Sequence, residues 1–148
     1  MWPDQAIPKQ WSLVLRPAAV AWRRSRRVQA YRARAARVAL IVRLPLASGL
    51  LSGKYKRDTQ FAPSDHRTYN RDGQAFNVGE TFAGLPFETG VELADALKPL
   101  VPEGMTMAQM ALRWCLDFEA VTAIIPGAKN PQMAEANAAA SDLPPLPA

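Results

Sequence analysis

The order of apolar and polar segments in this chain of 148 residues predicts a parallel α/β fold. The apolar run at 38–46 is nearly continuous, which is typical of a strand buried on both faces, and 121–125 is a second short apolar run. A long polar stretch and two helical patterns lie between the runs, and a third helical pattern follows. Two parallel strands need a long crossover connection between them, usually one that contains a helix, and this order of segments provides it.

The first strand is expected to end at Pro45, because proline cannot donate to a strand ladder, and a turn follows at 47–49. From Gly53 to Glu88 the chain is polar, and repeated glycine and proline break any long periodicity. This stretch is therefore predicted to be a long loop. Ordered loops of such length are uncommon unless they cover a site.

Three helices are expected in the second half of the chain, at about 88–100, 106–117 and 130–140. Thr106 and Gln109 form a capping-box pattern, while Asn130 and Pro131 suit a helix N-terminus. The apolar face of the first helix would carry Val91, Ala94 and Leu97. The apolar face of the second helix would carry Met110, Ala111, Trp114 and Cys115. The tail at 143–148 is expected to be extended.

The charge of the chain is unevenly distributed. Residues 1–43 hold ten basic side chains and one acid, for a net charge of +9, whereas 44–148 hold eight bases and twelve acids, for −4. Fourteen of the twenty-one residues at 19–39 are Ala or Arg, with Val28, Tyr31, Ala35 and Val38 at helical spacing. We therefore predict an Ala/Arg-rich extension, 1–37, of low or helical order, followed by a mildly acidic globular part.

Four interpretations of the extension remain open. It could be a transit peptide, an arginine-rich arm that neutralises nucleic-acid phosphates, or a basic helix on an anionic membrane. It could also have no selected function, because Ala and Arg are typical of GC-rich DNA read in a shifted frame. The sequence has no run of 18 apolar residues, and the single Cys115 favours a reducing, cytoplasmic location.

The ends of the two predicted strands are the candidate site, because ligands gather at the carboxyl ends of parallel strands. One end gives Pro45 to Gly49 with Lys54 shortly after, and the other runs through Gly127 and Lys129 into a helix N-terminus. A helix N-terminus with a nearby lysine suits a phosphate group. The alternative is an ordinary strand-to-helix turn with a solvated lysine.

Four segments in the same order along the chain resemble the aldo-keto reductase family over about residues 38–143. They are Leu44-Pro-Leu-Ala-Ser-Gly-Leu-Leu-Ser-Gly-Lys-Tyr55, the loop from Asp65 to Phe82, the helix from Met107 to Leu116, and Ile124-Ile-Pro-Gly-Ala-Lys-Asn130 continuing to Asn137. The resemblance implies the C-terminal fragment of a TIM (β/α)8 barrel, comprising its last two strand–helix units. It also implies that the family's partners are NADP(H) and a small carbonyl compound, which is reduced by hydride transfer, with no nucleic-acid or membrane partner.

The resemblance further implies a set of cofactor-binding residues. Those expected along the pyrophosphate and nicotinamide ribose are Leu44, Pro45, Leu46, Ala47, Ser48 and Gly49. Lys54 and Arg67 would lie near the phosphates. Gly127 and Lys129 would meet the 2′-phosphate, and Asn137 would meet the adenine. Met133 and Ala136 stand where the family usually has side chains that hydrogen-bond adenine, so a weaker hold on the cofactor is expected.

The family's catalytic Asp, Tyr, Lys and His come from early strands that have no counterpart here, so no catalytic residue and no metal ligand is predicted. His66, Tyr69, Tyr55 and Lys54 are candidates for a substitute acid–base set, but the predicted loop offers nothing rigid to hold them.

We therefore expect the C-terminal part of an NADP-dependent reductase, truncated or frame-shifted near residue 37, inactive alone and marginally stable. Whether a second chain completes the barrel stays open. The alternative is a non-enzymatic nucleotide-binding remnant with a basic arm for nucleic acid or membrane.

Overall fold

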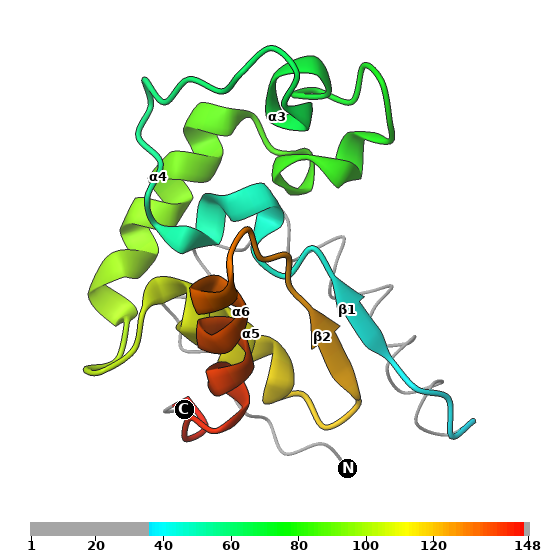
Figure 1. Ribbon diagram of the computed structural model, residues 1–148, viewed down its shortest axis with the longest axis vertical. Helices are drawn as coiled ribbons and strands as arrows, with labels where there is room; N and C mark the ends of the chain where they lie inside the picture. Colours follow the sequence, from blue (N-terminus) through cyan, green and yellow to red (C-terminus); the bar gives the residue numbers. More distant parts are fainter. Residues whose placement is uncertain (1–35, 147–148) are drawn as a thin grey trace.

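The computed structural model describes residues 36–146, and the predictions for 1–35 and 147–148 lie outside them. Figure 1 shows two adjacent strands with helices on one side and a lobe of short helices at one end. The elements are β1 (Ile41–Arg43), η1 (Ala47–Ser52), α3 (His66–Tyr69), η2 (Val78–Glu80), η3 (Phe82–Gly84), α4 (Phe87–Leu97), η4 (Lys98–Leu100), α5 (Met107–Leu116), β2 (Ala123–Ile125), α6 (Pro131–Ala138) and η5 (Ala139–Ser141).

The two strands pair in parallel, as the order of the segments predicts. Ile41 lies opposite Ala123, and Arg43 lies opposite Ile125. The pairing begins where the Thr122 amide donates to the Leu40 carbonyl at 2.9 Å. Each strand has three residues, so both are shorter than the apolar runs that predict them. In Figure 1 both strands run toward the same end of the molecule.

The prediction that the first strand is buried on both faces is wrong. Ile41 is 57% exposed, and Ile125 on the neighbouring strand is 58% exposed. Within residues 36–146 the sheet has two strands, and α5 is the helix that packs closely on β2. The apolar run therefore identifies the strand, while its burial depends on neighbours that the described residues do not supply.

The core lies between α4, α5 and η1. The first of its two groups of buried side chains consists of Leu50, Phe82, Phe87 and Val91, and the second of Ala94, Leu97, Met107 and Met110. Gly90 on α4 lets η1 approach, since a Cβ there would lie 2.6 Å from the Leu50 side chain. The burial of Val91, Ala94 and Leu97 confirms the predicted face of the first helix.

The second helix buries Met110, Ala111 and Cys115 as predicted, whereas Trp114 is half-buried. Leu112, which the predicted face leaves out, is fully buried. The face that α5 buries is therefore wider than the predicted stripe.

Both predicted helix caps are present. The Gln109 amide donates to the Thr106 hydroxyl at 3.2 Å, and the Thr106 amide donates back to the Gln109 side chain at 3.0 Å. The Asn130 side chain accepts from the Met133 amide at 2.8 Å, and Pro131 opens α6. These bonds satisfy amides that have no partner inside the helix.

The long loop predicted at 53–88 is ordered around one buried side chain, Asn70, which has no exposed surface. Its side-chain oxygen accepts from the amides of Ala75 and Phe76 at 3.0 and 2.6 Å. Its side-chain nitrogen donates to the Thr81 hydroxyl at 2.9 Å. Because Thr81 is also fully buried, these bonds join the end of α3 to the segment that enters the core at Phe82.

We predict that Asn70→Ala destabilises the chain by about 2 kcal/mol, because the buried Thr81 hydroxyl and the amides of Ala75 and Phe76 lose their partner. Urea unfolding measures the loss as a lower midpoint. Asn77→Ala is the matched control, since Asn77 is exposed and its side chain makes no capping bond, and it should change stability by less than about 0.5 kcal/mol. Equal effects of the two substitutions would contradict the role of Asn70.

We predict that the Cys115 thiol reacts slowly with iodoacetamide in the folded chain. Burial raises the pKa of this thiol to about 11, so little thiolate is present at neutral pH. Alkylation at about pH 8 should be at least about a hundredfold slower than in urea. Because the chain has a single cysteine, the rate reports on α5 alone. Equal rates with and without urea would show that α5 is not packed.

Candidate cofactor site

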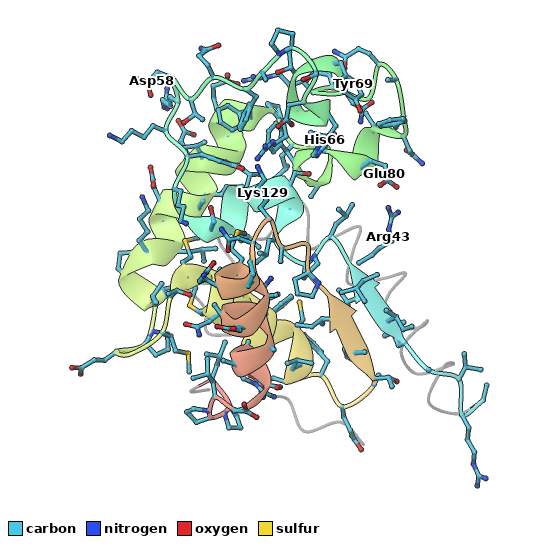
Figure 2. All side chains as sticks on the ribbon, viewed as in Figure 1. Arg43, Asp58, His66, Tyr69, Glu80 and Lys129 are labelled. Atoms are coloured by element: carbon cyan, nitrogen blue, oxygen red, sulfur yellow. The ribbon has the colours of Figure 1, made fainter. Side chains whose placement is uncertain are left out.

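Two loops leave the sheet at the same edge. Residues 44–49 follow β1 and residues 126–130 follow β2, and the last residues of the two strands, Arg43 and Ile125, face each other. Figure 2 shows Lys129 at the tip of the second loop, beyond the ends of the strands. The structure therefore brings the two predicted strand ends together, at the position where parallel folds hold ligands.

The backbone of the first loop is strained. Leu44, Ala47 and Ser48 have φ values of 52°, 48° and 56°, and Gly49 follows at 96°. The left-handed region costs roughly 1–2 kcal/mol for each residue with a Cβ, and such residues gather at functional sites. The turn is closed by bonds from the Ala47 amide to the Leu44 carbonyl at 3.0 Å and from the Gly49 amide to the Leu46 carbonyl at 2.9 Å. Pro45 is buried beneath it.

Ser48 is held by three groups from the long loop. Its hydroxyl donates to the Glu80 carbonyl at 3.3 Å and lies 3.4 Å from Nε2 of His66. Its carbonyl accepts from the Tyr55 hydroxyl at 3.2 Å. Both the backbone and the side chain of the strained residue are therefore fixed from outside the turn.

Arg67, which the resemblance assigns to the cofactor phosphates, is engaged with groups of its own loop. Its Nε donates to the Asp65 carboxylate at 2.8 Å, and its two terminal nitrogens donate to the same carboxylate and to the Tyr55 hydroxyl. The guanidinium also lies over the Phe61 ring, 4.4 Å from its centroid. The Asp65 side chain in addition accepts from the Arg67 amide at 2.9 Å and so caps α3.

These bonds shift the ionisation of the pair. The hydrogen bonds from Arg67 hold the pKa of Asp65 well below its usual range, and the bonds to Asp65 raise the pKa of Arg67. The side chains are 21% and 12% exposed, so solvent screens the pair less than it would an exposed one. The pair is fully charged at neutral pH.

A second ion pair attaches the long loop to the strand. Arg43, the last residue of β1, donates through both terminal nitrogens to the Glu80 carboxylate at 2.7 and 2.8 Å. Hydrogen bonding to Arg43 lowers the pKa of Glu80. Figure 2 shows the two side chains pointing toward each other. The sequence does not predict this pair, because two opposite charges 37 positions apart leave no local pattern.

The remaining basic candidates, Lys54 and Lys129, are exposed and have no ion-pair partner within residues 36–146. Asn137 donates from its side chain to the Gly127 carbonyl at 3.2 Å, so the last turn of α6 contacts the loop after β2 and these two predicted residues meet. A Cβ placed on Gly127 would contact nothing within 4 Å, which leaves this side of the loop open. Met133 and Ala136 are exposed on α6.

The four residues considered as an acid–base set do not meet at one point. His66 and Tyr55 both contact Ser48, but Lys54 is exposed and the ring of Tyr69 packs against Phe76 at 5.8 Å. In the described part of the chain, no three His, Cys, Asp or Glu side chains lie where they could hold a metal ion. None of the helices described there is long and apolar enough to cross a membrane.

We predict that acid weakens the chain partly through Asp65. Its folded pKa is depressed, so its contribution to stability is complete above the ordinary aspartate pKa of about 4 and is lost as the pH falls further. Urea midpoints should show Asp65→Asn below the original chain at neutral pH, with the gap closing in acid. Asp58→Asn, at an exposed carboxylate without an ion-pair partner in 36–146, should leave the pH dependence unchanged. A gap that stays constant with pH would contradict the prediction.

Comparison with known proteins identifies the family. The sequence model of the aldo/keto reductase family matches residues 10–148, so the match begins upstream of the segments that carry the resemblance. A protein described as a probable voltage-gated potassium channel subunit beta, from Arabidopsis thaliana, is 32% identical over 108 residues, which cover 69% of this chain and 29% of that protein. A protein with the same description from Oryza sativa subsp. japonica is 32% identical over 107 residues, with the same coverage of both chains.

A third relative, L-glyceraldehyde 3-phosphate reductase from Escherichia coli O157:H7, is 35% identical over 101 residues, which cover 68% of this chain and 28% of that protein. The chain thus spans less than a third of the length of these curated relatives. The family match extends over nearly the whole sequence. The chain belongs to the aldo/keto reductase family.

Proposed function

We propose that this chain is the NADP-binding C-terminal part of an aldo/keto reductase, an oxidoreductase that reduces a carbonyl compound. The observation that carries the proposal is the parallel register that brings both predicted cofactor loops, 44–49 and 126–130, to one edge of the sheet. The proposal includes the last two strand–helix units at 38–143, a tail at 144–148 and a separate basic extension at 1–37. It also includes a reducing, cytoplasmic location, since the one cysteine is buried and unpaired.

The side chains at this edge suit the phosphate groups of the cofactor. Lys54 and Lys129 each offer an ammonium group without an ion-pair partner in the described residues, and α6 presents its positive N-terminal end at Pro131. The open loop at Gly127 leaves room for an anion beside Lys129. In this proposal Lys129 binds the 2′-phosphate, and Lys54 lies near the pyrophosphate. Bound NADPH supplies the hydride.

The adenine end of the site is weaker. Asn137 uses one amide proton on the Gly127 carbonyl, and its oxygen and second amide proton have no partner in residues 36–146. These two groups can bond adenine. Met133 and Ala136, exposed on the same helix, can offer adenine no side-chain hydrogen bond. We therefore propose that the cofactor is held mainly through its phosphates.

Carbonyl reduction itself needs groups beyond this site. The Tyr55 hydroxyl is engaged with Ser48 and Arg67, and the His66 ring contacts the Ser48 hydroxyl, so neither is placed as a proton donor to a substrate. We propose that residues 36–146 bind and orient the cofactor and do not complete the reaction alone.

We predict that the chain binds NADPH with a Kd of about 1 mM or weaker, and about tenfold more tightly than NADH. NMR titration of the purified full chain measures both. Lys129→Gln should remove the preference for NADPH, because the ammonium group that meets the 2′-phosphate is lost. Lys56→Gln is the matched control, an exposed lysine in the long loop with no ion-pair partner in 36–146, and should keep the preference. Equal binding of NADPH and NADH by the original chain would overturn the proposal.

A further inference from the structure

The Tyr55 hydroxyl sits between a cation and a backbone carbonyl, and this position fixes the direction of its proton. A guanidinium can only donate hydrogen bonds, so the hydroxyl accepts from Arg67. The hydroxyl proton is then directed to the Ser48 carbonyl, 3.2 Å away. The Arg67 guanidinium is in turn held by the Asp65 carboxylate. The network thus ends on the backbone of a residue with a left-handed conformation.

We propose that Tyr55 is a positioning residue, whose hydroxyl holds the turn at Ala47–Gly49 in its left-handed form, and that Arg67 orients that hydroxyl. The role of the turn in binding a cofactor rests on the proposed function. The hold of Tyr55 on the turn does not, because it follows from contacts within the chain.

The core fixes where the hydroxyl of Tyr55 lies. Its ring makes an edge contact with Phe61 at 5.1 Å and a tilted contact with Phe87 at 6.1 Å. Phe87 is 1% exposed and begins α4, so the ring rests on a buried and regular element. A side chain held this way can transmit the position of the core to the turn.

The turn is shaped to receive this side chain. Gly49 has a φ of 96°, and a Cβ there would collide with the Tyr55 hydroxyl. The absence of a side chain therefore serves both the backbone conformation and the approach of the tyrosine. The other contacts of Ser48, with Glu80 and His66, are made by its hydroxyl and leave its carbonyl to Tyr55.

The test compares Tyr55→Phe with Tyr69→Phe by hydrogen exchange of the full chain. Tyr55→Phe keeps the ring and removes only the hydroxyl. The amides of Gly49 and Leu51, which donate to the Leu46 carbonyl, should exchange about tenfold faster, while the amides of α5 keep their protection. Tyr69→Phe removes the hydroxyl of a tyrosine that is 44% exposed and should change neither.

A second variant tests the role of Arg67. Arg67→Lys keeps the positive charge but removes the planar guanidinium, which donates to Asp65 and to the Tyr55 hydroxyl at the same time. Asp65 can then no longer orient the hydroxyl through residue 67. Exchange at Gly49 and Leu51 should again be faster, with α5 unchanged. Unchanged exchange at these two amides in both variants overturns the proposal. So does an equal loss of protection in the turn and in α5, since that is the result of a merely structural side chain.

NADPH titration tests separately whether the turn binds the cofactor, which is the part of this inference that rests on the proposed function. Tyr55→Phe should weaken NADPH binding about fivefold or more, and Tyr69→Phe should leave it unchanged. If the original chain binds no NADPH, the proposed function is wrong, while the exchange result still decides the role of Tyr55. If exchange responds and binding of NADPH does not, Tyr55 holds the turn as proposed, and what is overturned is the role of the turn in binding the cofactor.

Discussion

Leu40 and Thr122 are 82 positions apart, and the hydrogen bonds between them begin the parallel pairing of β1 with β2. The candidate site depends on this pairing, because neither loop has a fixed place without it. Three residue pairs in register bring Leu44 and Pro126 out at one edge. Parallel pairs this short are weak by themselves, and the packing of α5 on β2 supports this one.

The left-handed turn after β1 shows how the chain compensates for local strain. Its backbone is unfavourable at three residues that carry a Cβ. The compensation comes from polar groups of the long loop that meet at Ser48. One of them is the Tyr55 hydroxyl, whose ring packs against Phe87 of α4. The loop and the turn are therefore one unit. A change in either should alter both.

The sequence predicts what local patterns determine. The caps at Thr106 and Asn130 and the buried face of α4 follow from neighbours within four residues, and they are confirmed. The order of apolar runs also predicts the parallel sheet. The sequence does not predict the burial of Asn70 or the Arg43–Glu80 pair. A solvated asparagine or charged side chain has the same sequence signature as a bonded one, and its partners are set only when the loop folds. The ion pair between Arg67 and Asp65 is likewise set only when the loop folds.

The Arg43–Glu80 ion pair makes one attachment of the long loop sensitive to salt concentration. Its side chains are 64% and 33% exposed, so dissolved ions reach the pair and reduce its attraction. The bonds of Asn70 lie in the interior, where dissolved ions have little influence. Rising ionic strength should thus loosen the loop at the strand while leaving it anchored at Asn70.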